Sequence, residues 1–198
     1  MKIEQSKFNV IFLGETEVGK TSIIKKYKEN IFQTSMLSTA GIDYIIDESQ
    51  FDGKIYKFKI FDTAGQERFK SIAGNTIKVA HGFFVVFSLT NIKSFYQVKY
   101  WITTIKENSP NKNIPIILIG NKCDLKKEVQ DELINEYKNN KGIKYFETSA
   151  LTGKNIHKIF TELYTEIYNI QKNKKGAEKE EVFSIEDKKV NKPKGKKC

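Results

Sequence analysis

Two glycines, a lysine and a threonine occur at a defined spacing near the start of the chain. The segment GETEVGKT covers residues 14–21, after the apolar run VIFL and before SIIKKY. Glycines let the backbone turn tightly, so that several N–H groups can point at one anion. Lys20 adds a positive charge and Thr21 adds a hydroxyl group. The pattern G-x-x-x-x-G-K-[ST] between a strand and a helix therefore predicts a phosphate-binding loop.

The loop residues have expected roles in binding a nucleoside triphosphate. The helix that follows presents its N-terminus to the anion. Lys20 is expected to reach the β- and γ-phosphates, and the Thr21 hydroxyl to bind Mg²⁺. A glycine turn with a chance lysine is the alternative, which the strand before the loop and the helix after it argue against. The residues of this segment expected to contact the nucleotide are Gly14, Glu15, Thr16, Glu17, Val18, Gly19, Lys20, Thr21 and Ser22.

A second polar segment, FDTAGQERF at residues 61–69, suits the metal ion and the terminal phosphate. Asp62 ends a predicted strand and can hold Mg²⁺ through water. Gly65 has no side chain, so its backbone N–H can approach the γ-phosphate. Gln66 can hold a water molecule in line for attack on that phosphate. A simple turn is the alternative, and the phosphate-binding loop upstream makes it the weaker interpretation.

Two tetrapeptides at later strand ends predict which base is bound. In NKCD, residues 121–124, the carboxylate of Asp124 can accept from two donors on one edge of guanine. Adenine lacks this pair of donors and would leave a buried carboxylate unpaired, which is costly. ETSA, residues 147–150, can offer backbone N–H groups to the guanine carbonyl. Together, after a phosphate-binding loop, they predict GTP and GDP as ligands.

The elements that must position these segments alternate along the chain. Apolar runs predict strands over residues 8–13, 43–50, 55–61, 82–88, 115–120 and 144–147. Apolar side chains at helical spacing predict helices over residues 94–108 and 155–171. An Asp-Gly pair at 52–53 predicts a hairpin between the second and third strands. The pattern predicts an α/β fold of the P-loop NTPase type, a three-layer sandwich with a six-stranded, mostly parallel sheet and helices on both faces.

The composition predicts one domain followed by a basic tail. The 198 residues carry a formal net charge of +10, and Arg68 is the only arginine. The shortage of arginine argues against nucleic acid as a partner. Residues 1–170 are expected to form the domain, whereas residues 171–198 hold ten lysines and five acidic residues and are expected to be disordered. The N-terminus has no apolar signal core and the chain only two cysteines, so a cytoplasmic location is expected.

The sequence resembles the Ras superfamily of small GTPases, and the Rab family most closely, over residues 7–169. The resemblance rests on GETEVGKT, STAGIDY, DTAGQERF, GNKCDL and ETSA. It implies a switch that binds and hydrolyses GTP with Mg²⁺ as cofactor and regulates intracellular vesicle and membrane traffic. Unaided hydrolysis is expected to be slow and to need a GTPase-activating protein.

The resemblance also implies roles for individual residues. Thr39 matches a threonine that binds Mg²⁺ and the γ-phosphate, so the implied metal ligands are Thr21, Thr39 and Asp62. Phe32 matches an aromatic residue that stacks on guanine, and Gln66 matches the catalytic glutamine. The positions matching the guanine-specificity residues are Asn121, Lys122, Asp124, Ser149 and Ala150.

The implied partners are regulators and a membrane. They are a guanine exchange factor, a GTPase-activating protein, a GDP-dissociation inhibitor or escort protein, and effectors of the GTP state; the protein itself is expected to be a monomer. Six lysines lie between residues 188 and 197, ahead of the terminal Cys198. Geranylgeranylation of Cys198, with the lysines as a second signal, predicts reversible binding to the cytosolic face of an intracellular membrane. The alternative is a solvated charge run with an incidental cysteine.

Departures from the family pattern leave two other functions open. Thr16 and Glu17 occupy loop positions that are often small in the family, which suggests a scaffold that holds GTP and scarcely hydrolyses it. A P-loop kinase is the second alternative, and NKCD and ETSA argue against it. Ala40, Thr76 and Ile77 replace residues usual in Rab effector surfaces, so the identity of the effector is not predicted.

Overall fold

Strands and helices alternate along the part of the chain that the structure describes. The computed structural model describes residues 3–32, 42–63 and 73–190, with side chains described within 7–32, 43–63 and 76–174. In chain order the elements are β1 (Ile3–Leu13), α1 (Lys20–Glu29), β2 (Ile42–Phe51), β3 (Lys54–Thr63), α2 (Ala73–Lys78), β4 (Gly82–Ser88), α3 (Ile92–Tyr96), α4 (Val98–Asn108), β5 (Ile116–Asn121), α5 (Asp131–Lys141), β6 (Lys144–Glu147) and α6 (Ile156–Val190).

The strands form one sheet in the order β2-β3-β1-β4-β5-β6. Only the β2–β3 pair is antiparallel, and all other neighbours are parallel, which confirms the predicted mostly parallel sheet. The chain moves to one side of β1 for β2 and β3 and to the other side for β4. Ligands of such sheets bind outside the carboxyl ends of the strands, where the order reverses. The loop after β1 lies at that point.

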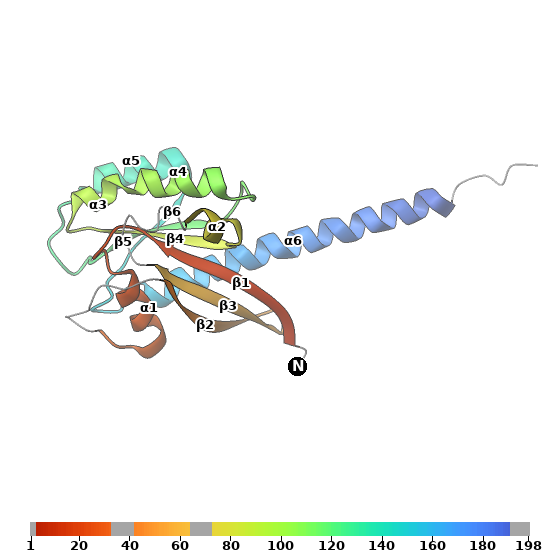
Figure 1. Cartoon of the computed structure of the whole chain (residues 1–198), viewed down its shortest axis with the longest axis horizontal. Helices are drawn as coiled ribbons and strands as arrows, with labels where there is room; N and C mark the ends of the chain where they lie inside the picture. Colours follow the sequence, from red (N-terminus) through yellow and green to blue (C-terminus); the bar gives the residue numbers. More distant parts are fainter. Residues whose placement is uncertain (1–2, 33–41, 64–72, 191–198) are drawn as a thin grey trace, which may run out of the picture.

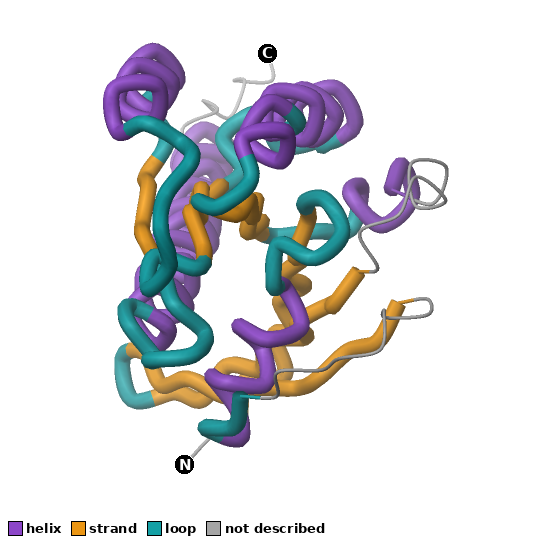
Figure 2. The backbone as a smooth tube through the Cα atoms, turned by 90° about the vertical axis from the view of Figure 1, so that its left-hand side faces the viewer, coloured by secondary structure: helices purple, strands orange, loops and turns teal. Residues whose placement is uncertain are grey.

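Helices cover both faces of the sheet, as the sequence predicts (Figures 1 and 2). Along β1, Val10 and Phe12 belong to a core shared with α1 and α6. Ile11 and Leu13 belong to a second core shared with α2, α3, α4 and α5. Both faces of β1 are therefore buried at its carboxyl end, which explains why residues 10–13 are a continuous apolar run.

The predicted hairpin joins β2 to β3. Asp52 and Gly53 both have positive φ angles, 46° and 73°, as the two central residues of a type I′ turn require. Phe51 then pairs with Lys54 across the turn, and the register continues to the pair of Ile42 with Thr63. The hairpin therefore brings the start of β2 beside the end of β3, where Asp62 lies.

Two predicted helices differ from the observed ones. Residues 94–108, predicted as one helix, belong to two: α3 ends at Tyr96 and α4 begins at Val98, with Gln97 between them. The first helix also begins earlier than predicted, because Asn91 caps it by accepting from the backbone N–H groups of Lys93 and Ser94. The last helix, predicted over 155–171, continues to Val190 through a segment expected to be disordered. Lysine and glutamate, which both favour helix, are frequent between residues 171 and 190, and this segment contains no proline.

The outer half of α6 projects beyond the sheet (Figure 1). Among the described residues, no helix is long and apolar enough to cross a membrane. Residues 191–198, and with them Cys198, lie outside the described residues.

Candidate functional site

The loop between β1 and α1 closes so tightly that two of its positions must be glycine. Gly14 and Gly19 have φ angles of 143° and 94°. A Cβ atom on Gly14 would lie 2.1 Å from the carbonyl oxygen of Val86, and one on Gly19 would lie 2.4 Å from Nδ2 of Asn121. The glycines predicted from the motif are thus required by backbone angle and by space. Gly19 also has no side chain with which to cap α1, so the N-terminus of this ten-residue helix faces the loop without a side-chain cap.

Lys20 is folded back into the loop. Its Nζ donates to the carbonyl oxygens of Gly14 at 2.9 Å and Glu15 at 2.7 Å. An ammonium group has three N–H donors, so these contacts leave one for a phosphate oxygen. Burial lowers the pKa of Lys20 to about 8, although the charges of Asp62 and Glu15 act in the opposite direction. A bound phosphate would favour the protonated form of this buried amine.

Thr21 and Asp62 lie together beside the loop, and their oxygens fit a magnesium ion. The Thr21 hydroxyl donates to Oδ2 of Asp62 at 2.6 Å. Oδ1 of Asp62 is buried and has no hydrogen-bond partner among the described residues, and burial raises the pKa of this carboxyl group. A buried carboxylate oxygen without a partner is costly, and Mg²⁺ prefers oxygen ligands. Two of the three predicted ligands, Thr21 and Asp62, are therefore adjacent, with an oxygen of the kind that a cation would stabilise.

Asn121 connects the phosphate-binding loop to the two predicted base-binding segments. Its Nδ2 donates to the carbonyl oxygen of Val18 at 2.9 Å, and its Oδ1 accepts from the Thr148 hydroxyl at 3.0 Å. The side chain is 1% exposed. The sequence assigns Asn121 to the guanine base, whereas these contacts use its amide group to hold three loops in position.

NKCD and ETSA are adjacent, as the predicted base site requires. The Cys123 N–H donates to the carbonyl oxygen of Thr148 at 3.1 Å, which joins the two loops. Asp124 is exposed, and Lys122 has a positive φ of 65° that turns the chain. The Ser149 N–H donates to the carbonyl oxygen of Lys154 at 3.2 Å.

In ETSA, the backbone N–H groups of Thr148 and Ser149 are used within the protein, by the carbonyl oxygens of Gly120 and Lys154. No such bond is made by the N–H of Ala150 in the described part of the chain. Ala150 is therefore a residue of ETSA that can donate to a ligand.

Two features of the phosphate-binding loop, a backbone conformation and a side-chain contact, are not indicated by the sequence motif. Glu17 is exposed and has a φ of 59°, a left-handed conformation that is unfavourable for a residue with a side chain. The side chain of Glu15 accepts from Nε1 of Trp101 at 3.3 Å, which ties the loop to α4. Trp101 lies in the helix predicted over residues 94–108, and its single polar atom, the indole N–H, is the signal from which such a contact could be expected.

The other predicted site residues are placed in part. Phe32 follows α1 and is 36% exposed, so its ring is accessible. Thr39, Gly65 and Gln66 lie outside the described residues. The predicted phosphate, metal and base segments are otherwise at one edge of the sheet, at the carboxyl ends of β1, β3, β5 and β6.

Comparison with known proteins agrees with this arrangement. A model of the Ras family matches residues 9–169. Rab-13 of Bos taurus is 38% identical over 162 residues, which is 81% of this chain and 79% of Rab-13. YPTC6 of Chlamydomonas reinhardtii is 36% identical over 169 residues, covering 84% of this chain and 78% of YPTC6. Human Rab-8B is 38% identical over 162 residues, covering 81% of this chain and 78% of Rab-8B.

These matches favour a hydrolysing switch over the non-hydrolysing scaffold that Thr16 and Glu17 suggest. The matched segment includes the phosphate-binding loop, Asp62 and both base-binding loops. The chain belongs to the Rab family of small GTPases within the Ras superfamily, whose members bind and hydrolyse GTP as switches in vesicle traffic.

Proposed function

We propose that the loop of residues 14–22 binds the phosphates of GTP and GDP. Three features support this: the tight turn at Gly14 and Gly19, the N-terminus of α1 behind the loop, and the remaining N–H donor of Lys20. In this arrangement Lys20 stays in contact with the loop carbonyls and turns its third donor to a β- or γ-phosphate oxygen. Its positive charge then offsets part of the charge of the triphosphate.

Thr21 and Asp62 would hold Mg²⁺, with Thr39 as a further ligand implied by the family. The unpartnered Oδ1 of Asp62 supports this assignment, since it is the atom most in need of a cation. Mg²⁺ bound there would neutralise charge on the β- and γ-phosphates. The Thr21 hydroxyl would turn its lone pairs to the ion and keep its proton on Asp62.

Asp124 would select guanine by accepting from N1–H and the N2 amino group. The N–H of Ala150 would donate to the guanine carbonyl, and Phe32 would stack on the ring. Lys122, Ser149 and Asn121 would position these groups, because the contacts of Ser149 and Asn121 are within the protein. ATP lacks the two donors that Asp124 needs and is rejected.

Hydrolysis would depend on Gln66, which holds the attacking water, and on an arginine supplied by a GTPase-activating protein. Such an arginine contributes about 10³- to 10⁵-fold to the rate. The chain has a single arginine, Arg68, two residues after Gln66. We expect slow single-turnover hydrolysis by the purified protein, slower still in Gln66→Leu. A turnover near one per second in the unaided protein would contradict the need for an arginine from a GTPase-activating protein.

The observation that carries the proposed nucleotide site is the buried Asp62 oxygen without a partner beside Thr21. The test is calorimetry on protein emptied of nucleotide, with GTP, GDP and ATP, each with and without Mg²⁺. We expect heat from the guanine nucleotides, stronger binding with Mg²⁺, and loss of that Mg²⁺ effect in Asp62→Asn. Equal binding of ATP, or a Mg²⁺ effect that survives in Asp62→Asn, would refute the assignment.

A second variant tests the base site separately. Asp124→Asn replaces one acceptor oxygen by an amide donor, so it should lose GTP. Xanthine carries a carbonyl where guanine carries the N2 amino group, so the variant should instead bind xanthosine triphosphate. Asp131→Asn, an exposed carboxylate at the start of α5, is the matched control and should leave the preference for GTP unchanged.

We further propose that Cys198 is geranylgeranylated and that the lysines before it bind anionic lipid. One lipid chain binds reversibly, and each lysine near an anionic leaflet adds about 1 kcal/mol. An escort protein or a GDP-dissociation inhibitor would carry the lipid through the cytosol. Mass spectrometry of the native protein should find the modification. An unmodified Cys198, with Cys198→Ser still on membranes, would exclude it.

A further inference from the structure

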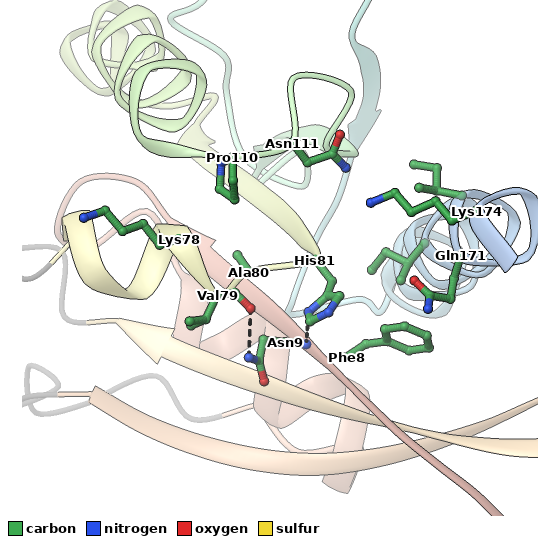
Figure 3. Close-up of a pocket in the computed structure, with 12 residues that line it drawn as sticks. Phe8, Asn9, Lys78, Val79, Ala80, His81, Pro110, Asn111, Gln171 and Lys174 are labelled. Carbon is green, nitrogen blue, oxygen red and sulfur yellow. Dashed lines mark hydrogen bonds between the residues drawn. The ribbon is translucent and has the colours of Figure 1, made fainter. Parts of the chain in front are cut away.

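A pocket of about 400 Å³ lies at the amino ends of the strands, away from the phosphate-binding loop. Its walls come from the middle of β1, the turn between α2 and β4, the loop between α4 and β5, and α6 (Figure 3). Apart from Phe32, which follows α1, the predicted nucleotide contacts within the described residues are at the carboxyl ends of the strands. The volume lies in the range of pockets that hold small molecules. GTP bound at the phosphate loop therefore leaves this pocket available.

The charges at this pocket are all positive. Lys78 and Lys174 line it, and no acidic residue does. Neither lysine makes an ion pair with a residue whose side chain is described. Figure 3 shows the Lys174 side chain extending from α6 toward Asn111 and His81. The pocket therefore favours an anion.

His81 supplies a fixed neutral donor. Its Nδ1 accepts from the backbone N–H of Asn9 at 3.1 Å, so the proton of the neutral ring is on Nε2. The Asn9 side chain donates to the carbonyl oxygen of Val79 at 2.9 Å, and the His81 N–H donates to the carbonyl oxygen of Asn9 at 2.8 Å. These three bonds hold the turn against β1. The ring is also packed edge-on against Phe8, with centroids 5.3 Å apart.

Most of the remaining lining is apolar, and Asn111 and Gln171 are its polar residues. Phe8 and Ile167 are buried at 2% and 3% exposure, and Ile170 is half-buried beside them on α6. Val79 is 55% exposed. A ligand that carried only charge would leave Ile170 and Val79 in contact with water. A ligand with an apolar part would cover them.

We propose that this pocket binds a small amphiphilic anion, a phosphate or carboxylate group joined to a short apolar chain. Lys174 and the Nε2–H of His81 bind the anionic group, and Ile167, Ile170 and Phe8 contact the chain. Walls from four separate segments suit a compact molecule better than an extended polypeptide. Lys78, at the end of α2, adds positive charge at the rim.

Proton and carbon NMR of the histidine rings tests this on the full-length, GDP-bound protein. The chain has two histidines, His81 and His157, so both signals can be followed. Octyl phosphate is the probe, with inorganic phosphate and octyltrimethylammonium as partial probes. We expect octyl phosphate to shift the His81 signal saturably and to raise the pKa of His81, while His157 stays unchanged. Both partial probes should bind at least about tenfold more weakly, because each lacks one half of the recognition.

Variants on α6 assign the effect to the pocket. Lys174→Gln should weaken octyl phosphate by about two- to fivefold, as expected for one exposed charge. Ile170→Glu should abolish binding, because it places a negative charge and a polar group on the apolar wall. Lys158→Gln, also exposed on α6 but outside the pocket, should bind as the wild type does. Absence of a saturable His81 shift, equal binding of either partial probe, or unchanged affinity in both pocket variants would overturn the proposal.

Discussion

Three polar side chains at the nucleotide site are buried but differ in what they still need. Lys20 has used two of its three donors, and Asp62 has one oxygen without a partner among the described residues. Asn121, in contrast, uses its amide oxygen and one of its two N–H donors within the protein. A buried group with an unmet need gains from a ligand. The unmet needs of Lys20 and Asp62 therefore support their proposed binding roles, and the contacts of Asn121 support a positioning role.

Glu17 has a backbone conformation that is unfavourable for a residue with a side chain. It has a left-handed φ of 59° at the mouth of the phosphate-binding loop, where its carboxylate is exposed. Glu17→Gln keeps the size and removes the charge, so it should bind GTP about two- to fivefold more tightly at low salt. The gain should shrink as salt is added, because exposed charges are screened.

Nucleotide dissociation rates at two salt concentrations measure this effect of Glu17. Glu132→Gln is the control, since Glu132 is an exposed acid on α5 and should leave the rates unchanged. A Glu17→Gln variant with unchanged affinity at low salt would show that this carboxylate does not act on the phosphates.

At the scale of elements, Asp47 joins α1, β2 and α6. Its carboxylate accepts from the Tyr27 hydroxyl at 2.6 Å, from Lys28 Nζ at 2.8 Å and from the Tyr164 hydroxyl at 3.1 Å. The side chain of Asp47 is 11% exposed. Asp47→Asn should reduce the free energy of unfolding by about 2 to 3 kcal/mol, because charged hydrogen bonds are lost at a buried site.

Urea unfolding of matched variants separates this junction from an ordinary surface contact. Glu48→Gln removes the neighbouring exposed acid, which pairs with Lys57 at 3.5 Å, and should cost less than about 0.5 kcal/mol. Tyr164→Phe keeps the stacking on Phe58 and loses one hydrogen bond, so it should cost about 1 kcal/mol. If Asp47→Asn were no worse than Glu48→Gln, the junction would not stabilise the fold.

The turn from α2 to β4 should make stability depend on pH through His81. Burial and the charge of Lys174 lower the pKa of His81 from its usual 6.5. Below pH 6.5 the unfolded chain therefore takes up a proton that the folded chain resists, and stability falls as the pH falls. His81→Gln cannot titrate, so its stability should fall less between pH 7 and 5. Thermal unfolding of both proteins across this range measures the difference, and identical pH profiles would contradict it.

The sequence predicts these elements best where one local rule dominates. Apolar residues in runs or at alternating positions predict all six strands, although β1 begins at Ile3 and its predicted start is residue 8. The Asp-Gly pair predicts the β2–β3 turn. The helix α5 has a single buried residue, Ile134, so its apolar periodicity is weak and it was not predicted. The contacts of Asn121 with Val18 and of Glu15 with Trp101 join residues far apart in the chain. No local pattern encodes such pairs.

At the scale of the whole molecule, the two ends of the strands are available for separate ligands. The loops after β1, β3, β5 and β6 lie at the carboxyl ends, and the pocket beside His81 lies at the amino ends. The helix α6 packs along one face and contributes Ile167, Ile170 and Lys174 to this pocket before it projects beyond the sheet. It thus connects the domain to the lysine-rich end of the chain.

The length of α6 needed by the domain follows from where its contacts with the sheet are. Ile167 is buried in the core, the Tyr168 ring stacks on Phe51 with centroids 4.7 Å apart, and Lys172 bonds to Asp52 at 2.8 Å. A chain ending at residue 174 should therefore keep its free energy of unfolding within about 0.5 kcal/mol of the full chain. A chain ending at residue 166 should lose at least about 3 kcal/mol, because it loses the buried Ile167 and both contacts of the β2–β3 turn. Urea unfolding of the GDP-bound proteins gives both values, and a loss above about 1 kcal/mol for the longer truncate would mean that the outer half of α6 or the tail packs on the domain.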